Sequence, residues 1–166
     1  MECSQIEEDD EKFSIGAMVT LRQIELHEGL NTWSHGAVKE SVTHIVGVQF
    51  RNLATVGGSI FGKFGFSDVL SCFLAFDSYV ELHHEGIIPL EQFAVNKYPD
   101  DILVRLIVKK HPQESVYLSH RNSRFSGFNM CHFIRKGRGL CSCWSKTIKS
   151  GKSKIIRSME CYDQRR

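Results

Sequence analysis

The sequence lacks three features that would place it in common classes of protein. No apolar run approaches the ~18 residues of a membrane-spanning helix, so we expect no membrane partner. The first eleven residues are acidic and lack the basic-then-apolar order of a signal peptide, which predicts a cytoplasmic location. Six cysteines are present without any C-x-x-C spacing, and a disulfide framework is not expected in a cytoplasmic chain.

Charge is distributed unevenly along the 166 residues, a length that suits one domain with a small appendage. Residues 1–128 hold 11 Lys/Arg and 17 Asp/Glu, which gives a net charge of −6. Residues 129–166 hold 10 Lys/Arg and 2 Asp/Glu, which gives +8. This asymmetry is typical of a basic tail that meets an acidic or nucleic-acid partner.

The order of short strands and helices predicts an α+β fold with a mixed, largely antiparallel sheet and flanking helices. A capping box formed by Thr20 and Gln23 predicts a helix over residues 21–26. Asn31 or Thr32 is expected to cap the next helix, whose apolar face would be formed by Val38, Val42, Ile45 and Val46. The other expected elements are strands at 13–17, 79–82, 102–108 and 116–122, a buried helix at 68–76 containing Cys72, and a helical turn at 89–93.

The stretch that carries the clearest chemical signal is Thr55-Val56-Gly57-Gly58-Ser59. Paired glycines allow positive φ and let a ligand approach the main chain closely. Successive N–H groups in such a turn can form an anion-binding nest, and the two hydroxyls add donors. From the pattern alone, the loop is either a phosphate cradle or a tight glycine turn between two elements, and the turn is the commoner of the two.

The residues around this loop carry a family resemblance. The matching stretches are 15–21 (IGAMVTL), 51–60 (RNLATVGGSI), 67–70 (SDVL), 74–82 (LAFDSYVEL), 88–93 (IPLEQF) and 101–103 (DIL). In this order and at this spacing they resemble the FAD-binding subunit or domain of the molybdenum hydroxylases, the family of xanthine dehydrogenase and carbon monoxide dehydrogenase. The resemblance covers about residues 13–110.

The resemblance implies a domain organisation. Residues 1–12 form an acidic extension, and residues 13–112 are similar to the second subdomain of a two-subdomain FAD-binding domain. Residues 113–166 begin the family's C-terminal subdomain and continue as a partial or diverged subdomain, a basic tail that contains cysteines. We expect this tail to be poorly ordered in isolation after about Ser123, because its apolar residues are sparse.

The resemblance also implies which residues hold FAD. These are Ala54, Thr55, Val56, Gly57, Gly58, Ser59, Asp68 and Leu103. The family usually has Asn where this chain has Ser59, and Arg51 and Asn52 are expected to fix the loop. Asp68 matches a position that binds the adenosine part of FAD, but it also reads as a helix cap. Leu103 matches an apolar contact to FAD, but it also reads as a core strand residue.

A function follows from the resemblance. FAD would take electrons from an iron–sulfur partner, in a complex with a molybdopterin subunit, and pass them to NAD or another acceptor, as in xanthine dehydrogenase. No side chain of this chain needs to act as an acid, base or nucleophile. The family also holds the FAD pyrophosphate with an upstream Gly-Gly-Thr-type loop that does not precede Phe13 here, so we expect the chain alone to bind FAD weakly. The alternative function is a degenerate, non-catalytic binding module that acts through the basic, Cys-rich tail.

Two weaker groups of side chains could bind other ligands. His83-His84-Glu85 has metal-ligand types, but a solvated turn is the favoured interpretation. The tail could bind zinc through Cys131, His132, Cys141, Cys143 and Cys161, although the irregular spacing favours incidental thiols. The tail could also bind nucleic acid with Phe133 and Trp144, but a solvated tail is favoured, and we expect no nucleic-acid partner.

Overall fold

The computed structural model describes the backbone of residues 2–64 and 67–110, with side chains from Cys3 onward, and the backbone of four later strands. The first part holds a 3-10 helix, η1 (Glu2–Ser4), and five strands: β1 (Ile6–Glu8), β2 (Lys12–Gly16), β3 (Ser78–Leu82), β4 (Gly86–Pro89) and β5 (Leu103–Lys109). The helices are α1 (Leu21–Leu26), α2 (Glu28–Trp33), α3 (Ala37–Thr43), α4 (Val48–Leu53), α5 (Val56–Phe61), α6 (Asp68–Ala75) and α7 (Leu90–Val95). The later strands are β6 (Ser115–Arg121), β7 (Phe128–Arg135), β8 (Ser142–Ser145) and β9 (Lys154–Arg157).

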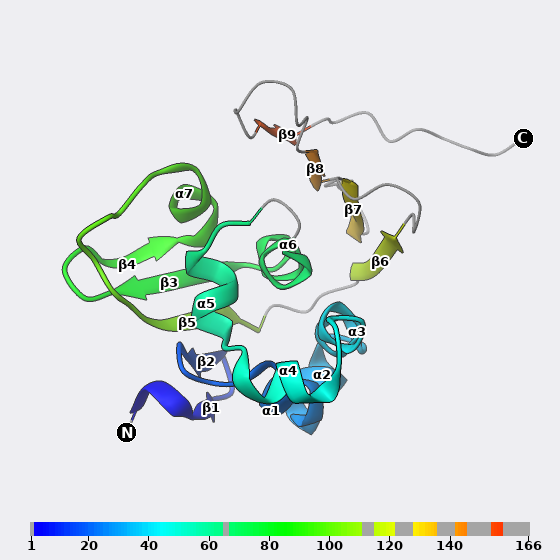
Figure 1. Ribbon diagram of the computed structural model, residues 1–166, viewed down its shortest axis with the longest axis horizontal. Coiled ribbons are helices and arrows are strands. Elements are labelled where there is room, and N and C mark those ends of the chain that lie inside the picture. The colour runs from blue at the N-terminus through cyan, green and yellow to red at the C-terminus, as the bar shows by residue number, and fades with distance from the viewer. Residues whose placement is uncertain are drawn as a thin grey trace, which may run out of the picture.

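The five strands of the first part form one antiparallel sheet in the order β1-β2-β5-β3-β4. Helices α5 and α6 lie over the sheet, and α1 to α4 gather beside it (Figure 1). The predicted α+β class, with a largely antiparallel sheet and flanking helices, is therefore confirmed. No helix in the described part of the chain has the length and apolar character needed to cross a membrane.

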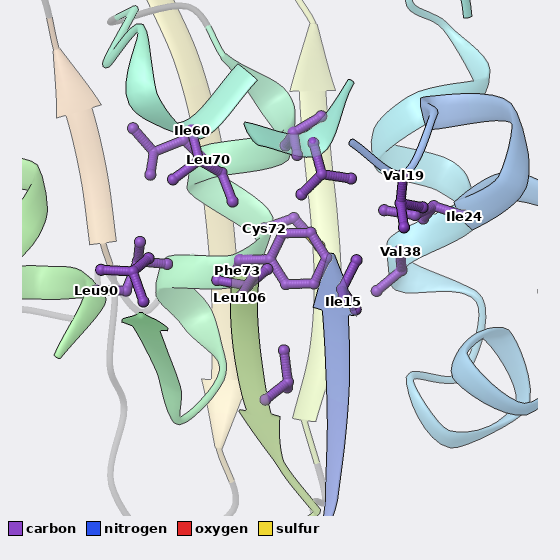
Figure 2. Packing of buried hydrophobic residues seen from close by; sticks show 14 of the residues in the cluster. Ile15, Val19, Ile24, Val38, Ile60, Leu70, Cys72, Phe73, Leu90 and Leu106 are labelled. Carbon is purple, nitrogen blue, oxygen red and sulfur yellow. The ribbon is translucent and has the colours of Figure 1, made fainter. Parts of the chain in front are cut away.

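The core forms where α6 packs on the sheet. Val69, Leu70, Cys72 and Phe73 of α6 are buried, as the nearly all-apolar run predicts. Phe73 belongs to one cluster with Ile15 of β2 and Leu106 of β5 (Figure 2). Burying a side chain of this size contributes roughly 1.5–3 kcal/mol, so this cluster supplies much of the fold's stability.

The helix α1 follows its sequence prediction. The Thr20 hydroxyl accepts a hydrogen bond from the Gln23 N–H at 3.2 Å, and the Gln23 amide oxygen accepts one from the Thr20 N–H at 2.8 Å. This reciprocal pair is the predicted capping box, and it starts the helix at Leu21.

The next two helices differ from their prediction. The side chain of His27, not Asn31 or Thr32, caps α2, because its Nδ1 accepts the Leu30 N–H at 3.1 Å. Asn31 lies inside that helix and donates its amide to the Glu25 carbonyl. Helix α3 ends at Thr43, so Val46 falls outside it, with φ 45° and its side chain exposed. The predicted apolar face is correct for the buried Val38 and Val42. It is wrong for Ile45 and Val46, which follow the helix, although Ile45 still packs against the core.

The tail contributes four strands. Strands β6 to β9 pair in sequence order as an antiparallel sheet. The expectation that residues after about Ser123 are poorly ordered in isolation stays a prediction, for amide hydrogen exchange to test. The strand predicted at 116–122 corresponds to β6.

Candidate functional site

The glycine stretch is the first turn of a helix rather than a loop. Ala54 ends α4, Thr55 caps α5, and Gly57 and Gly58 lie within α5. In the described residues, the glycines with positive φ are Gly36 and Gly86. The expectation of a φ > 0 turn at the pair is therefore wrong, because Thr55 starts a helix there: its hydroxyl accepts the Gly58 N–H at 3.1 Å.

Backbone hydrogen bonds fix this turn to the segment that joins β2 to α1. The Gly57 N–H donates to the Ala17 carbonyl at 2.8 Å and the Val56 N–H to the Val19 carbonyl at 2.9 Å. In the other direction, the Leu21 N–H donates to the Ala54 carbonyl at 2.9 Å. Three N–H groups of the turn, those of residues 56, 57 and 58, are thus bonded inside the protein, so they do not form the open nest that the sequence suggests.

The two glycines have different roles. Gly57 is buried, and a Cβ on it would lie 2.7 Å from the Ala17 carbonyl oxygen and 2.8 Å from the Ala17 Cβ. Gly58 is exposed, and a Cβ on it would meet the Thr55 hydroxyl at 3.2 Å. Gly57 is therefore required for close packing, whereas Gly58 leaves a surface without a side chain where a ligand can approach the backbone.

The hydroxyl groups of Thr55, Ser59 and Ser67 bond to backbone groups of residues 55–59. The Thr55 hydroxyl accepts its bond from Gly58, so its hydrogen is available to donate to an anion. The Ser59 hydroxyl donates to the Thr55 carbonyl at 3.0 Å, and the Ser67 hydroxyl donates to the Ser59 carbonyl at 3.1 Å. The second bond ties the start of α6 to the glycine turn.

Asp68 follows the glycine turn by about ten residues along the chain. It is the first residue of α6 and not the cap of that helix. Ser67 caps α6 by accepting the Leu70 N–H at 3.2 Å, and Asp68 is the first residue of the helix, buried at 8% exposure. The cap prediction for Asp68 is therefore wrong by one residue. Because Ser67 also bonds to Ser59, Asp68 is held next to a residue that contacts the glycine turn.

Leu103 lies in the sheet. It opens β5 opposite Leu82 of β3, is 7% exposed, and belongs to the hydrophobic core. The interpretation as a core strand residue is the one that the geometry supports directly.

A group of charges joins α1 to α4, the helix that precedes the glycine turn. The guanidinium of Arg51 contacts the carboxylate of Glu25 twice, at 2.9 Å and 3.3 Å, and Arg22 contacts the same carboxylate at 2.8 Å. Burial raises the pKa of Glu25, but the hydrogen bonds and positive charges of Arg22 and Arg51 lower it by more. The net pKa lies below that of an ordinary glutamate, so the carboxyl stays ionised at a lower pH. Sequence reasoning missed Glu25, because its partner Arg51 lies 26 residues further along the chain and no local pattern connects the two.

The hairpin between β3 and β4 carries the exposed His83, His84 and Glu85, as the solvated-turn interpretation predicts. The Asp101 carboxylate accepts hydrogen bonds from the N–H groups of His84 and Glu85, both at 3.0 Å, and from its neighbour Ile102 at 2.7 Å. Within the described residues, no group of three metal-ligating side chains could hold an ion. The candidate zinc ligands of the tail, for which incidental thiols were the favoured interpretation, lie outside the residues whose side chains are described, as do Phe133 and Trp144.

We expect Asp101→Asn to remove the part of the folding stability that depends on the ionised carboxylate of Asp101. Burial raises the pKa of Asp101, but the three backbone N–H groups lower it by more. The stabilisation is therefore present above the pKa of ~3.9 of an unfolded Asp and is lost as the pH falls through the lower folded pKa. Thermal melts from pH 7 to pH 2 should show a gap between wild type and variant that closes only in acid. A gap of constant size would contradict this assignment.

A family model now connects the site to known proteins. Residues 1–110 match the model described as the FAD binding domain in molybdopterin dehydrogenase. The chain belongs to this family. FAD is accordingly its cofactor, and the resemblance inferred from the sequence is confirmed.

Solved structures share the fold of this FAD-binding domain. CO dehydrogenase from Oligotropha carboxidovorans matches with a TM-score of 0.69 and 18% identity over 86% of this chain and 54% of that chain. CO dehydrogenase from Hydrogenophaga pseudoflava, in a form that lacks the Mo-pyranopterin moiety, matches with a TM-score of 0.70 and 20% identity, over 85% and 53%. Quinoline 2-oxidoreductase from Pseudomonas putida 86 gives 0.68 and 14%, over 86% and 54%. The chain spans about half the length of these relatives. No curated protein sequence matches it.

The residues present fit a flavin nucleotide at the glycine turn. A diphosphate needs hydrogen-bond donors and a close approach to the main chain. The exposed Gly58 leaves that approach open, and the Thr55 hydroxyl supplies a donor beside it. The segment that anchors the turn, Ala17 and Val19, was part of the family motif at 15–21, which is the signal that marks it in the sequence.

Proposed function

We propose that this chain is the FAD-carrying component of a molybdenum-containing hydroxylase or dehydrogenase similar to xanthine dehydrogenase. FAD supplies the electron chemistry, taking electrons from an iron–sulfur subunit and giving them to NAD or another acceptor. The chain's own residues bind and orient it. The observation that carries the proposal is the exposed, side-chain-free face at Gly58 next to a hydroxyl donor, on a chain of the FAD-binding family.

The proposed FAD contacts are Ala54, Thr55, Val56, Gly57, Gly58, Ser59, Asp68 and Leu103. Six of them fall into two classes by exposure. Thr55, Gly58 and Ser59 would face the cofactor, since Gly58 is exposed and the other two are half-buried. Val56, Gly57 and Leu103 are buried, so their contribution would be to hold the wall of the site in place.

Partners are proposed on the names of the similar structures. One solved relative is a Cu,Mo-CO dehydrogenase, and another is described by its missing Mo-pyranopterin moiety. These names support a molybdopterin subunit as a partner of this chain. An iron–sulfur subunit is proposed as a second partner from the family resemblance of the sequence alone. The cytoplasmic location inferred from the sequence stays a prediction.

The proposal is tested by placing a negative charge at Gly58. We expect Gly58→Asp to raise the Kd for FAD at least about tenfold, a loss of about 1.4 kcal/mol of binding free energy. The new carboxylate would repel the diphosphate of FAD, and it would accept the hydrogen bond that the Thr55 hydroxyl would otherwise donate to the diphosphate. The measurement is isothermal titration of FAD, with far-UV circular dichroism to show that the variant is folded.

The matched control is Gln92→Glu, which adds the same charge at an exposed position of α7. Its Kd should stay within about twofold of the wild type, since an exposed charge away from the ligand is screened. Equal FAD affinity in wild type and Gly58→Asp would contradict the proposed site.

A further inference from the structure

The buried charges of Glu25 on α1 and Arg51 on α4 form a geometrically defined pair. Side-chain exposure is 7% for both Glu25 and Arg51. Arg51 Nε lies 2.9 Å from Glu25 Oε2, and Arg51 Nη2 lies 3.3 Å from Glu25 Oε1. Two parallel contacts fix the plane of the guanidinium relative to the carboxylate as well as its distance.

Arg51 has a second set of bonds on its remaining nitrogen. Nη1 donates to the carbonyl of Thr43 at 3.1 Å and to that of Ile45 at 3.2 Å, with Val46 at 3.5 Å. These carbonyls belong to the end of α3 and the connection to α4. One side chain on α4 therefore joins α1, through Glu25, to the chain that leaves α3.

Both members of the pair are close along the chain to the anchored glycine turn. Arg51 lies in the last turn of α4, which ends where Ala54 begins the cofactor segment. Glu25 lies on α1, whose first residue, Leu21, donates its N–H to the Ala54 carbonyl. The pair therefore fixes the relative position of the two helices whose ends meet at the turn.

We infer that Arg51, through its ion pair with Glu25, is a positioning residue for FAD. The pair holds the Ala54–Gly58 segment in the geometry that accepts the cofactor, and this positioning sets the affinity. The inference rests on the proposed function, in that the segment is taken as the FAD site. Neither side chain needs to contact FAD, because both are buried.

The geometry explains why arginine suits this position. A lysine would keep the positive charge but would present a single ammonium in place of the planar fork. It would not contact the carboxylate twice and bond the Thr43 and Ile45 carbonyls at the same time. The angle between α1 and α4 would then be less restricted, while the charge balance of the buried site would be kept.

The test is Arg51→Lys, with Arg22→Gln as the matched control. Arg22 contacts the same carboxylate but is 33% exposed, and no bond from it to residues 43–46 is seen among the described residues. In ligand-free protein, Arg51→Lys should speed amide hydrogen exchange at residues 56–58 by on the order of tenfold, and it should raise the Kd for FAD by a similar factor. Arg22→Gln should change both by less than about twofold.

The outcomes separate positioning from plain stability. If Arg51→Lys lowers the melting temperature while exchange at 56–58 and the Kd for FAD match the wild type, the pair is structural and the inference is overturned. If Arg51→Lys fails to fold, Glu25→Gln is measured in its place and should give the same two changes; wild-type values in that variant overturn the inference.

Failure of the proposed function gives a different result. If the wild-type protein does not bind FAD at all, the proposed FAD site is contradicted. The exchange rates at residues 56–58 would still decide whether the pair fixes the turn, because they are measured without ligand. Unchanged exchange in Arg51→Lys and Glu25→Gln overturns the inference on that measurement alone.

Discussion

Gly57→Val is expected to destabilise the folded chain by about 3 kcal/mol, the upper part of the usual range for added bulk in a packed interior. A Cβ at this position would lie 2.7 Å from a backbone oxygen of Ala17, which cannot rotate away as a side chain can. The branched side chain adds two more carbon atoms at the same place. For a chain of this length, the melting temperature should fall by roughly 6–12 °C. FAD binding should also be lost, because the added side chain would break the hydrogen bond from Gly57 to Ala17 that holds the turn in place.

Gly58→Ala is the control for this prediction. The added methyl group would meet the rotatable hydroxyl of Thr55 at 3.2 Å and is otherwise exposed. Since alanine favours a helix over glycine by about 1 kcal/mol, this variant should be as stable as the wild type or slightly more so. Thermal melts followed by circular dichroism compare the two. Equal melting temperatures for Gly57→Val and the wild type would show that the turn is not packed against Ala17.

Glu25→Leu is the second variant for which a large effect is expected. The substitution leaves the buried Arg51 with backbone carbonyls as its described partners and without a counter-charge. Removing one member of a buried pair costs about 3–5 kcal/mol, mostly because the other charge stays out of water. Urea denaturation should therefore show a midpoint well below that of the wild type, with the slope unchanged.

The double variant Glu25→Leu/Arg51→Met separates this cost from a loss of packing. It removes both buried charges, so a large part of the lost stability should return. Full recovery is not expected, because the carbonyls of Thr43 and Ile45 lose their donor. If Glu25→Leu unfolds at the wild-type midpoint, water or another side chain must compensate Arg51, and the account of this pair is wrong.

Local signals in the sequence predicted much of the fold. The capping box at Thr20 and Gln23 marks the start of α1 correctly. The alternation in 79–82 and the apolar run around Cys72 identify β3 and the buried α6. These features depend on residues a few positions apart, where period and capping chemistry act directly.

Non-local contacts explain what the sequence did not predict. Two adjacent glycines have low helix propensity, so the pattern reads as a turn. The helix forms because Thr55 caps it and because Ala17 and Val19, some forty residues earlier, accept its first N–H groups. The pair of Glu25 and Arg51, 26 residues apart, likewise leaves no periodic pattern. The family motifs marked the proposed FAD segment, whereas the residues that support this segment became visible only in the fold.

The measurement that tests the FAD site most directly is a titration of the isotope-labelled chain with FAD, followed by proton–nitrogen correlation spectra. This method detects weak as well as tight binding and assigns it to individual residues. The account predicts that amide signals of residues 55–59 shift in a saturable way, and that Gly58→Asp reduces these shifts. Saturable shifts confined to other residues, with the signals of 55–59 unmoved at saturating FAD, would contradict it.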